Sequence, residues 1–466
     1  MFQPYNLTSL DHFLPPVHLN LSLAFSLTDK DRVQALQRME DAMARVLSKF
    51  PFLAGMVVPS TQRNGRRNAL QVRPATAAEL EECHILVTQH HIESTALTVD
   101  GKFNTALTPF QIVSPPPNPS PVLRLKANVI GNELHLALCL DHRVMDGSGA
   151  FAFISTLGAY CRDLNAPGSF TTSLAQEETR KHIEEIASTA TPQDLPWTKF
   201  PPQTSEDEVP PDSNQVPISI PHVLDGRKIK MLHDACNSVL QSLHEKYKKD
   251  LPEMSLSPNL VVTALVSICS SRARSKAFPD KPELSSTMFV VENLRKALNL
   301  RRGYMGNVIV ANQSPCDGSA HPPPEALQNI HVPEPLSPVG PEDIWRICNV
   351  VQTLQEASGR MDKQYAEGMI ATMFRECDWA SFRPGWGVDL LVSDIKSAKP
   401  FANFGPLGDL QSFDVRFDAF PGICWIMPNP PSDSTSPDPC WRLRWVLERA
   451  AMECLSSDPL FHWASV

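Results

Sequence analysis

The most regular pattern of hydrophobic and polar positions lies in the first half of the chain, at residues 133–140. Leucine occupies every second position from Leu134 to Leu140, with His, Ala and Cys between the leucines. Successive side chains of a strand point to opposite faces, so this alternation predicts a strand with one apolar face. Apolar residues then recur at helical spacing from Phe151 to Cys161. The segment therefore predicts a strand, a tight turn and a helix.

The rest of the chain mixes the same two kinds of pattern. A strand-like alternation covers residues 19–27, and apolar residues at helical spacing follow over 33–50. The second half has a helical pattern after Asp225 and strand-like segments at 308–311 and 422–427. Strands and helices that alternate throughout a chain are typical of an α/β or α+β protein.

Proline-rich segments divide the chain. The 466 residues exceed what one ordinary hydrophobic core holds, so we expect at least two domains. The 43 prolines concentrate in polar runs, which predict loops, at residues 114–121, 191–217, 321–341 and 428–439. The run at 191–217 is the longest and lies near the middle of the chain. It predicts a crossover linker between a first domain at 1–190 and a second domain at 218–466.

Composition narrows the functional classes. The net charge is −9 and no dense run of Lys or Arg occurs, which argues against a nucleic-acid partner. The first residues lack the pattern of a signal peptide, and no apolar stretch approaches a membrane span, so we expect a soluble cytoplasmic protein. The 11 cysteines form no CxxC pair, which predicts reduced thiols and no zinc site.

The predicted turn after residue 140 carries the candidate chemistry. His142 is the only histidine among 14 that is followed by an aspartate four positions later, Asp146, and Gly147 comes next. A histidine titrates near neutral pH, so His142 could take the proton from an attacking hydroxyl or amine. A thioester is already activated and needs no serine or cysteine nucleophile. Asp146 could orient the imidazole or pair with a distant arginine, and the sequence leaves both roles open.

The strand followed by His142-x-x-x-Asp146-Gly147 resembles the coenzyme-A-dependent acyltransferase superfamily. Three further segments resemble its BAHD branch in the right order, particularly fungal secondary-metabolite O-acyltransferases such as the trichothecene O-acetyltransferases. They are Leu10-Asp11-His12-Phe13-Leu14-Pro15-Pro16, Leu47-Ser48-Lys49-Phe50-Pro51-Phe52-Leu53-Ala54-Gly55, and Val291 to Asn307. The last segment contains Asn293-Leu294-Arg295-Lys296, which resembles the family's Arg-containing segment, and Tyr304-Met305-Gly306-Asn307. The resemblance extends over most of the chain.

This resemblance implies two similar chloramphenicol-acetyltransferase-like domains, each a mixed sheet with flanking helices, joined by a long crossover loop. It implies a monomeric enzyme that moves an acetyl or other short acyl group from acyl-CoA to a hydroxyl or amine of a small lipophilic metabolite. The catalytic residues would be His142, as general base, and Asp146, while Gly147, Asn307 and Ser393 would lie at the acyl-CoA. Acyl-CoA is the co-substrate, and neither a permanent cofactor nor a metal is implied.

The second family signature, DFGWG, is altered here. The matching segment begins at Asn403, ten residues after Ser393, and asparagine replaces the family's aspartate. The resemblance implies that this aspartate pairs with an arginine, which maps to Arg295. We therefore expect Arg295 to need another carboxylate or to be exposed, because an unpaired buried charge costs about 3–5 kcal/mol.

The strand before that signature also departs from the family. Val392 replaces a threonine that can donate a hydrogen bond to the developing oxyanion, and Asp394 replaces a tryptophan. The loss of such a donor can lower a rate by about 10²–10³. We expect Ser393, Asn307 or a backbone N–H to supply the bond instead.

Two rival interpretations remain. Asp141-His142-Arg143-Val144-Met145-Asp146-Gly147 also resembles the motif of dihydrolipoyl acyltransferases. Those enzymes carry it near the C-terminus after a lipoyl domain, which makes this interpretation the poorer one. The other rival is a family member that has lost transfer activity and binds or cyclises a lipophilic metabolite in the same channel. An assay of thiol release from acyl-CoA separates transfer from binding alone.

Overall fold

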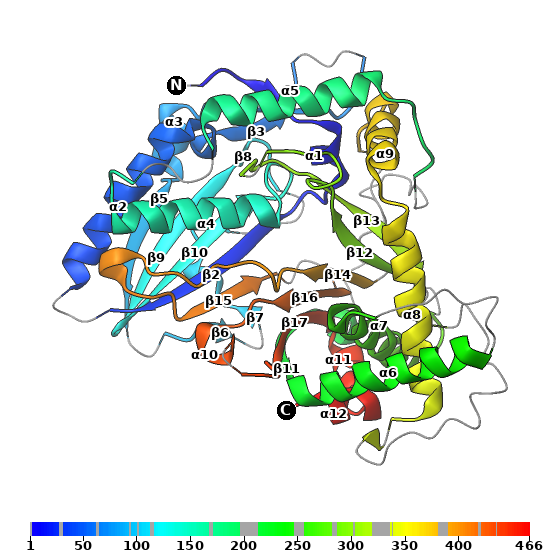
Figure 1. Ribbon diagram of the computed structural model, residues 1–466. Coiled ribbons are helices and arrows are strands. Elements are labelled where there is room, and N and C mark those ends of the chain that lie inside the picture. Colours follow the sequence, from blue (N-terminus) through cyan, green and yellow to red (C-terminus); the bar gives the residue numbers. More distant parts are fainter. Residues whose placement is uncertain are drawn as a thin grey trace.

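The computed structural model contains two central sheets with helices packed against them (Figure 1). The described residues are 2–27, 31–61, 65–92, 95–99, 102–111, 116–166, 171–195, 213–246, 256–281, 287–301, 303–318, 336–337, 339–380, 390–417, 421–434 and 436–466. The predicted mixture of strands and helices is confirmed. Most of the 321–341 run and the centre of the 191–217 run lie outside these residues.

The first sheet has five strands, and β10 lies at its centre. Their order is β15 (Ser412–Arg416), β2 (His18–Ser26), β10 (Glu133–Asp141), β9 (Leu123–Ile130) and β5 (Leu86–His91). Strand β10 runs antiparallel to both neighbours, with Leu138 opposite Leu21 of β2 and Leu125 of β9. The strands predicted at 133–140 and 19–27 are confirmed as β10 and β2.

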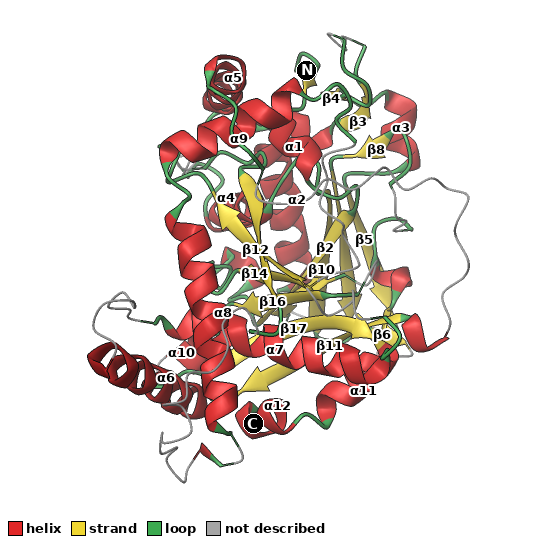
Figure 2. Cartoon of the chain, turned by 90° about the vertical axis from the view of Figure 1, so that its right-hand side faces the viewer, coloured by secondary structure: helices red, strands yellow, loops and turns green. Residues whose placement is uncertain are grey.

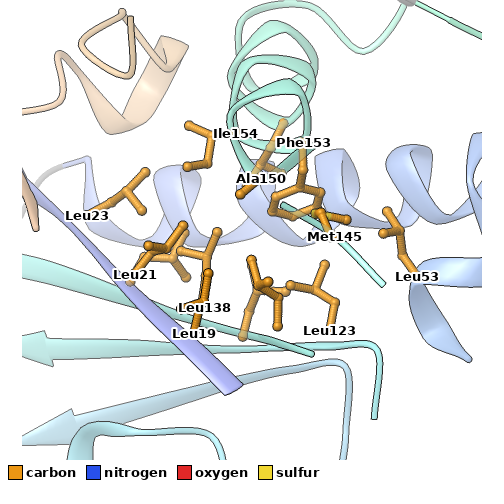
Figure 3. Packing of buried hydrophobic residues seen from close by; sticks show 14 of the residues in the cluster. Leu19, Leu21, Leu23, Leu53, Leu123, Leu138, Met145, Ala150, Phe153 and Ile154 are labelled. Carbon is orange, nitrogen blue, oxygen red and sulfur yellow. The ribbon is translucent and has the colours of Figure 1, made fainter. Parts of the chain in front are cut away.

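Helices α2 (Arg32–Lys49) and α4 (Gly147–Arg162) cover the leucine face of this sheet. Figure 3 shows side chains of α4, including Phe153 and Ile154, packing over leucines of β2 and β10. The helix predicted at 33–50 is confirmed as α2, and the sequence pattern after the turn is confirmed as α4. Apolar burial on this face fixes the end of β10, and with it the turn that carries His142.

The second sheet has six strands. Their order is β11 (Pro217–Leu224), β17 (Trp441–Glu448), β16 (Ile423–Met427), β14 (Leu390–Asp394), β12 (Thr287–Asn293) and β13 (Ile309–Pro315). A separate core packs one of its faces against helices α6 (Gly226–Lys246), α7 (Pro258–Ala277), α8 (Pro341–Gly359), α11 (Arg449–Ser456) and α12 (Pro459–Ala464). Figure 2 shows these helices on the side of the second sheet away from β2 and β10. The predicted strands at 308–311 and 422–427 and the helix after Asp225 are confirmed.

Smaller elements complete the described part of the chain. A four-stranded sheet has the order β1 (Tyr5–Asn6), β4 (Leu70–Arg73), β3 (Met56–Pro59) and β8 (Ser120–Pro121), and β6 (Thr98–Val99) pairs with β7 (Lys102–Phe103). The remaining helices are α1 (Ser9–Phe13), α3 (Ala77–Glu82), α5 (Ser173–Thr189), α9 (Lys363–Arg375) and α10 (Pro431–Ser434). Helix α10 is one turn inside the proline-rich run predicted to be a loop.

One strand crosses between the halves of the sequence. Strand β15 belongs to the second half, yet it pairs antiparallel with β2 at the edge of the first sheet, with Phe413 opposite Leu23. The first sheet therefore depends on both halves of the chain. The boundary at 191–217 stays a prediction, since residues 196–212 are outside the described part.

Candidate active site

Three backbone and ionic contacts hold the turn that carries His142. The N–H of His142 donates to the carbonyl of Val17 at 3.0 Å, and Val144 N donates to the carbonyl of Asp141 at 3.0 Å. The buried carboxylate of Asp141 accepts from Arg143 Nε at 2.8 Å and Nη2 at 2.5 Å. These contacts hold the backbone on both sides of residue 142 and so fix the position from which the His142 side chain extends.

The imidazole of His142 has one nitrogen bound and one available. Nδ1 lies 3.1 Å from the carbonyl oxygen of Met145. A carbonyl can only accept, so Nδ1 carries the proton in the neutral ring and Nε2 keeps its lone pair. Burial lowers the pKa of His142 below its ordinary value, and the charge of Asp146 opposes this shift. The ring is therefore largely neutral at pH 7, the state that a general base needs.

The carboxylate of Asp146 bonds to Arg295 and to two backbone N–H groups, and within the described residues no hydrogen bond joins it to the imidazole. Its oxygens accept from Arg295 Nη1 at 2.8 Å and Nη2 at 3.0 Å, from Gly149 N at 2.9 Å and from Val308 N at 3.0 Å. The aspartate is the N-cap of α4 and is fully buried. Of the two roles that the sequence left open, this geometry is that of pairing with a distant arginine.

Arg295 has another carboxylate, which is one of the two expected alternatives, and it does not bond to Asn403. Its partner is Asp146, whereas Asn403 donates from Nδ2 to Asp409 at 3.0 Å and accepts from Gly405 N at 2.8 Å. The DFGWG-like segment packs against α2 and α4. Arg295 follows β12 in the second sheet, and none of its hydrogen bonds in the described structure goes to Asn403.

A cavity of about 150 Å³ lies between the two sheets, and His142 forms part of its wall. Most of the wall is aliphatic or aromatic, with contributions from both sheets and α4, among them Leu19, Leu21, Phe151, Val291, Leu391, Phe413, Phe417, Ile423 and Trp425. Gly147, Ser148, Asn293, Ser393 and Asp394 also line it. The space can therefore hold an apolar group beside the lone pair of His142.

Val392 does not face the cavity, which corrects the expectation that a valine at this position costs the site an oxyanion donor. Along β14, Ser393 lies opposite Trp425 of β16, and both residues line the cavity. Val392 points to the other face and is buried in the core under the helices of the second sheet. Strand alternation makes this separation unavoidable, and a valine at 392 removes no donor from the cavity wall. Asp394 follows at the strand end and accepts from Lys396 N at 2.8 Å.

Asn307 lies behind the site and does not belong to the cavity wall described above. Its backbone N and its Nδ2 donate to Asp11 Oδ1 at 3.2 and 2.9 Å. Burial raises the pKa of Asp11 to about 6, while its hydrogen bonds from Thr8 and Asn307 oppose the shift. Asp11 comes from the N-terminal Leu-Asp-His segment, so this pair joins the start of the chain to the second half.

The described residues contain no cluster of three or more His, Cys, Asp or Glu side chains that could hold a metal ion. In the same residues, no helix has the length and hydrophobicity that a membrane crossing requires. Sequence reasoning missed Ser148 and Asn293 at the cavity wall. The position of Ser148 directly after the His-x-x-x-Asp-Gly motif was the available signal for the first of them.

Comparison with known proteins adds independent information. A model of the Transferase family matches residues 3–320. Communesin N16 acyltransferase of Penicillium expansum is 27% identical over 482 residues, which cover 99% of this chain and 98% of that protein. Fumigaclavine B O-acetyltransferase of Aspergillus fumigatus is 26% identical, over 100% of this chain and 98% of that protein.

Solved structures share the fold. TRI101 of F. graminearum, in complex with coenzyme A and deoxynivalenol, superposes with a TM-score of 0.68 at 16% identity, covering 100% of this chain and 99% of that chain. Vinorine synthase gives 0.60 at 14% identity, covering 100% and 94%. The two-domain acyltransferase fold is therefore confirmed. Because the family model covers more than half of the chain, the protein belongs to the Transferase family, the BAHD acyltransferases that use acyl-CoA as co-substrate.

Proposed function

We propose that this protein transfers an acetyl or other short acyl group from acyl-CoA to a hydroxyl or amine of a small lipophilic secondary metabolite. One observation carries the proposal: His142 has its Nδ1 fixed by the carbonyl of Met145 at 3.1 Å, while its ring lines an apolar cavity between the sheets. A neutral imidazole held in this tautomer is ready to accept a proton at Nε2.

The reaction needs no covalent enzyme intermediate. Nε2 of His142 takes the proton of the acceptor hydroxyl or amine as its oxygen or nitrogen attacks the thioester carbon. The carbonyl π electrons move to oxygen and give a tetrahedral oxyanion. On collapse the C=O bond re-forms, the C–S bond breaks, and the coenzyme A thiolate takes the proton back from His142. The products are an ester or amide and free coenzyme A.

The other motif residues support this chemistry from different places. Asp146 is a positioning residue, because it caps α4 and pairs with Arg295 without contacting the imidazole. Gly147 and Ser393 lie at the cavity wall, where we assign them to the acyl-CoA. Asn307 acts indirectly, through its bonds to Asp11.

The apolar wall and the relatives support a lipophilic acceptor. A cavity with aromatic and aliphatic walls favours ligands with few charges, since a buried unpaired charge is costly. Two relatives act, by their names, on communesin and fumigaclavine B. We propose that the protein works as a cytoplasmic monomer, and the 11 free cysteines support a reducing compartment.

Release of free thiol from acetyl-CoA tests this function. The purified protein should release thiol only when a hydroxylated or amino lipophilic acceptor is present, and His142→Ala should abolish the release. A general base contributes about 10²–10⁴ in rate, so retention of more than about a tenth of the turnover would contradict the assignment.

His135→Ala is the matched control for this experiment. His135 lies on the same strand, on the face away from the leucines, and pairs with Glu133 at 2.8 Å. Its loss should leave turnover near that of the wild type. A protein that binds such acceptors but never releases thiol would instead be the transfer-inactive binder or cyclase considered above.

A further inference from the structure

Ser148 and Asn293 meet across the two sheets at the wall of the His142 cavity. Ser148 is the second residue of α4, and Asn293 ends β12. Asn293 Nδ2 donates to Ser148 Oγ at 3.0 Å. Both side chains line the same cavity as His142, and neither belongs to the His-x-x-x-Asp motif.

The direction of this hydrogen bond follows from the other bonds of Asn293. Its Oδ1 accepts from Arg295 N at 3.0 Å and from Arg295 Nη1 at 3.4 Å. An amide with its oxygen held by donors must turn its nitrogen to Ser148. Ser148 Oγ is therefore the acceptor in that bond, and its own proton is left for a third group. Within the described residues no protein atom accepts that proton.

The surroundings of Ser148 favour negative charge. Gly147 and Ser148 precede the first intrahelical bond of α4, from Ala150 N to the Asp146 carbonyl at 2.9 Å. The amino end of a 16-residue helix carries a partial positive charge from its aligned peptide dipoles. A hydroxyl donor at this end, with its proton free, suits an oxygen that becomes negative during a reaction.

We propose that Ser148 is the side-chain donor to the acyl carbonyl oxygen and that Asn293 positions it. This role rests on the proposed transfer function. As the acceptor attacks the thioester carbon, the carbonyl electrons move to oxygen, and Ser148 donates its O–H to that oxyanion without losing the proton. When the C–S bond breaks the C=O bond re-forms, and the proton path between acceptor, His142 and coenzyme A is unchanged.

Ser393 is the competing donor, because it lines the cavity from β14. Within the described residues its hydroxyl has no hydrogen bond that sets the direction of its proton. Ser148 has such a bond, from Asn293. Preorganised donors stabilise an oxyanion better than donors that must reorient, and this distinction favours Ser148.

Thiol release from acetyl-CoA compares Ser148→Ala, Ser148→Thr, Ser393→Ala and the control Ser48→Ala, whose hydroxyl is exposed on α2. Loss of an oxyanion donor should lower the kcat of Ser148→Ala by about 10²–10³ with little change in KM for acetyl-CoA. Ser148→Thr keeps a hydroxyl and should stay within about tenfold of the wild type, whereas Ser393→Ala should lose much less than Ser148→Ala.

Asn293→Ala tests the positioning role. It should lower kcat by roughly tenfold in the wild type and add almost nothing to Ser148→Ala, because two residues that act as one unit are not additive. Melting temperatures of all variants show whether each protein is folded.

Three results would overturn the inference: unchanged kcat in folded Ser148→Ala, a loss confined to KM for the acceptor, or a Ser148→Thr enzyme as poor as Ser148→Ala. Each of these results counts against Ser148 only if the wild type is active and His142→Ala is inactive. A wild type without transfer activity removes the proposed function itself, and the role of Ser148 falls with it.

Discussion

Replacing Asp146 with Asn removes one charge from the buried pair with Arg295 and leaves the shape of the side chain. An asparagine oxygen can still accept from Gly149 N, so the N-cap of α4 survives. The Arg295 side chain is only 14% exposed, and its guanidinium would lose its carboxylate. Breaking a buried pair in this way costs about 3–5 kcal/mol, because the remaining charge stays buried and uncompensated.

A loss of about 3 kcal/mol should lower the melting temperature of Asp146→Asn by about 3 °C, because an unfolding entropy of about 2.1 cal/mol/K per residue applies to all 466 residues. Asp362→Asn is the matched control. Asp362 is also a helix N-cap, on α9, but it is exposed and its carboxylate caps Tyr365 N, with no ion pair in the described residues. Calorimetry on both variants should show this shift for Asp146→Asn and almost none for Asp362→Asn.

The same substitution should alter the pH profile of any remaining activity. The charge of Asp146 raises the pKa of His142, against the lowering by burial. Its removal lowers that pKa further, so the acidic limb of kcat/KM should move to lower pH. An unchanged melting temperature, or an acidic limb that moves to higher pH, would refute the structural account of Asp146. A double variant with Arg295→Met should recover part of the lost stability, because it removes the stranded charge.

Three further predictions follow from single contacts. Asn403→Asp should lower stability by up to about 1 kcal/mol in urea denaturation, and less in high salt, because it turns the bond to Asp409 into a like-charge contact. Burial lowers the pKa of His18 to about 4, so between pH 6.5 and 4 the unfolded chain binds more protons than the folded chain. The free energy of unfolding therefore falls as the pH drops through that range. His18→Gln should weaken this pH dependence, measured by denaturation at pH 7 and pH 5. Gly149→Ala should strongly destabilise the protein in a thermal melt, because a Cβ there would clash with the backbone carbonyl of Met305.

Local pattern was enough to predict the strand, turn and helix that present His142. Alternating leucines defined β10, and helical spacing after the turn defined α4, because burial of one face imposes these periods. The alternation Ser-Phe-Asp-Val-Arg at β15 was also present, but it does not show which sheet the strand joins.

The contacts that complete the site depend on long-range pairing, which local periods do not encode. Asp146 and Arg295 are 149 positions apart, and the family resemblance places the partner of Arg295 at the position that Asn403 occupies. The roles of Val392 and Ser393 depend on a register shift of one residue in β14, which exchanges core and cavity faces. The family resemblance named the candidate segments, and the structure shows which of their side chains meet.

The pairing of β15 with β2 has a consequence for folding. The edge of the first sheet is closed by residues almost 400 positions further along the chain, with Ser412 opposite Ala24. A ribosome would therefore release the first half with β2 unpaired on that side, and an unpaired strand edge is a template for aggregation. The first sheet can be finished only after nearly the whole chain is made. Fragments cut between the halves should consequently be insoluble alone and regain structure only when both are present together.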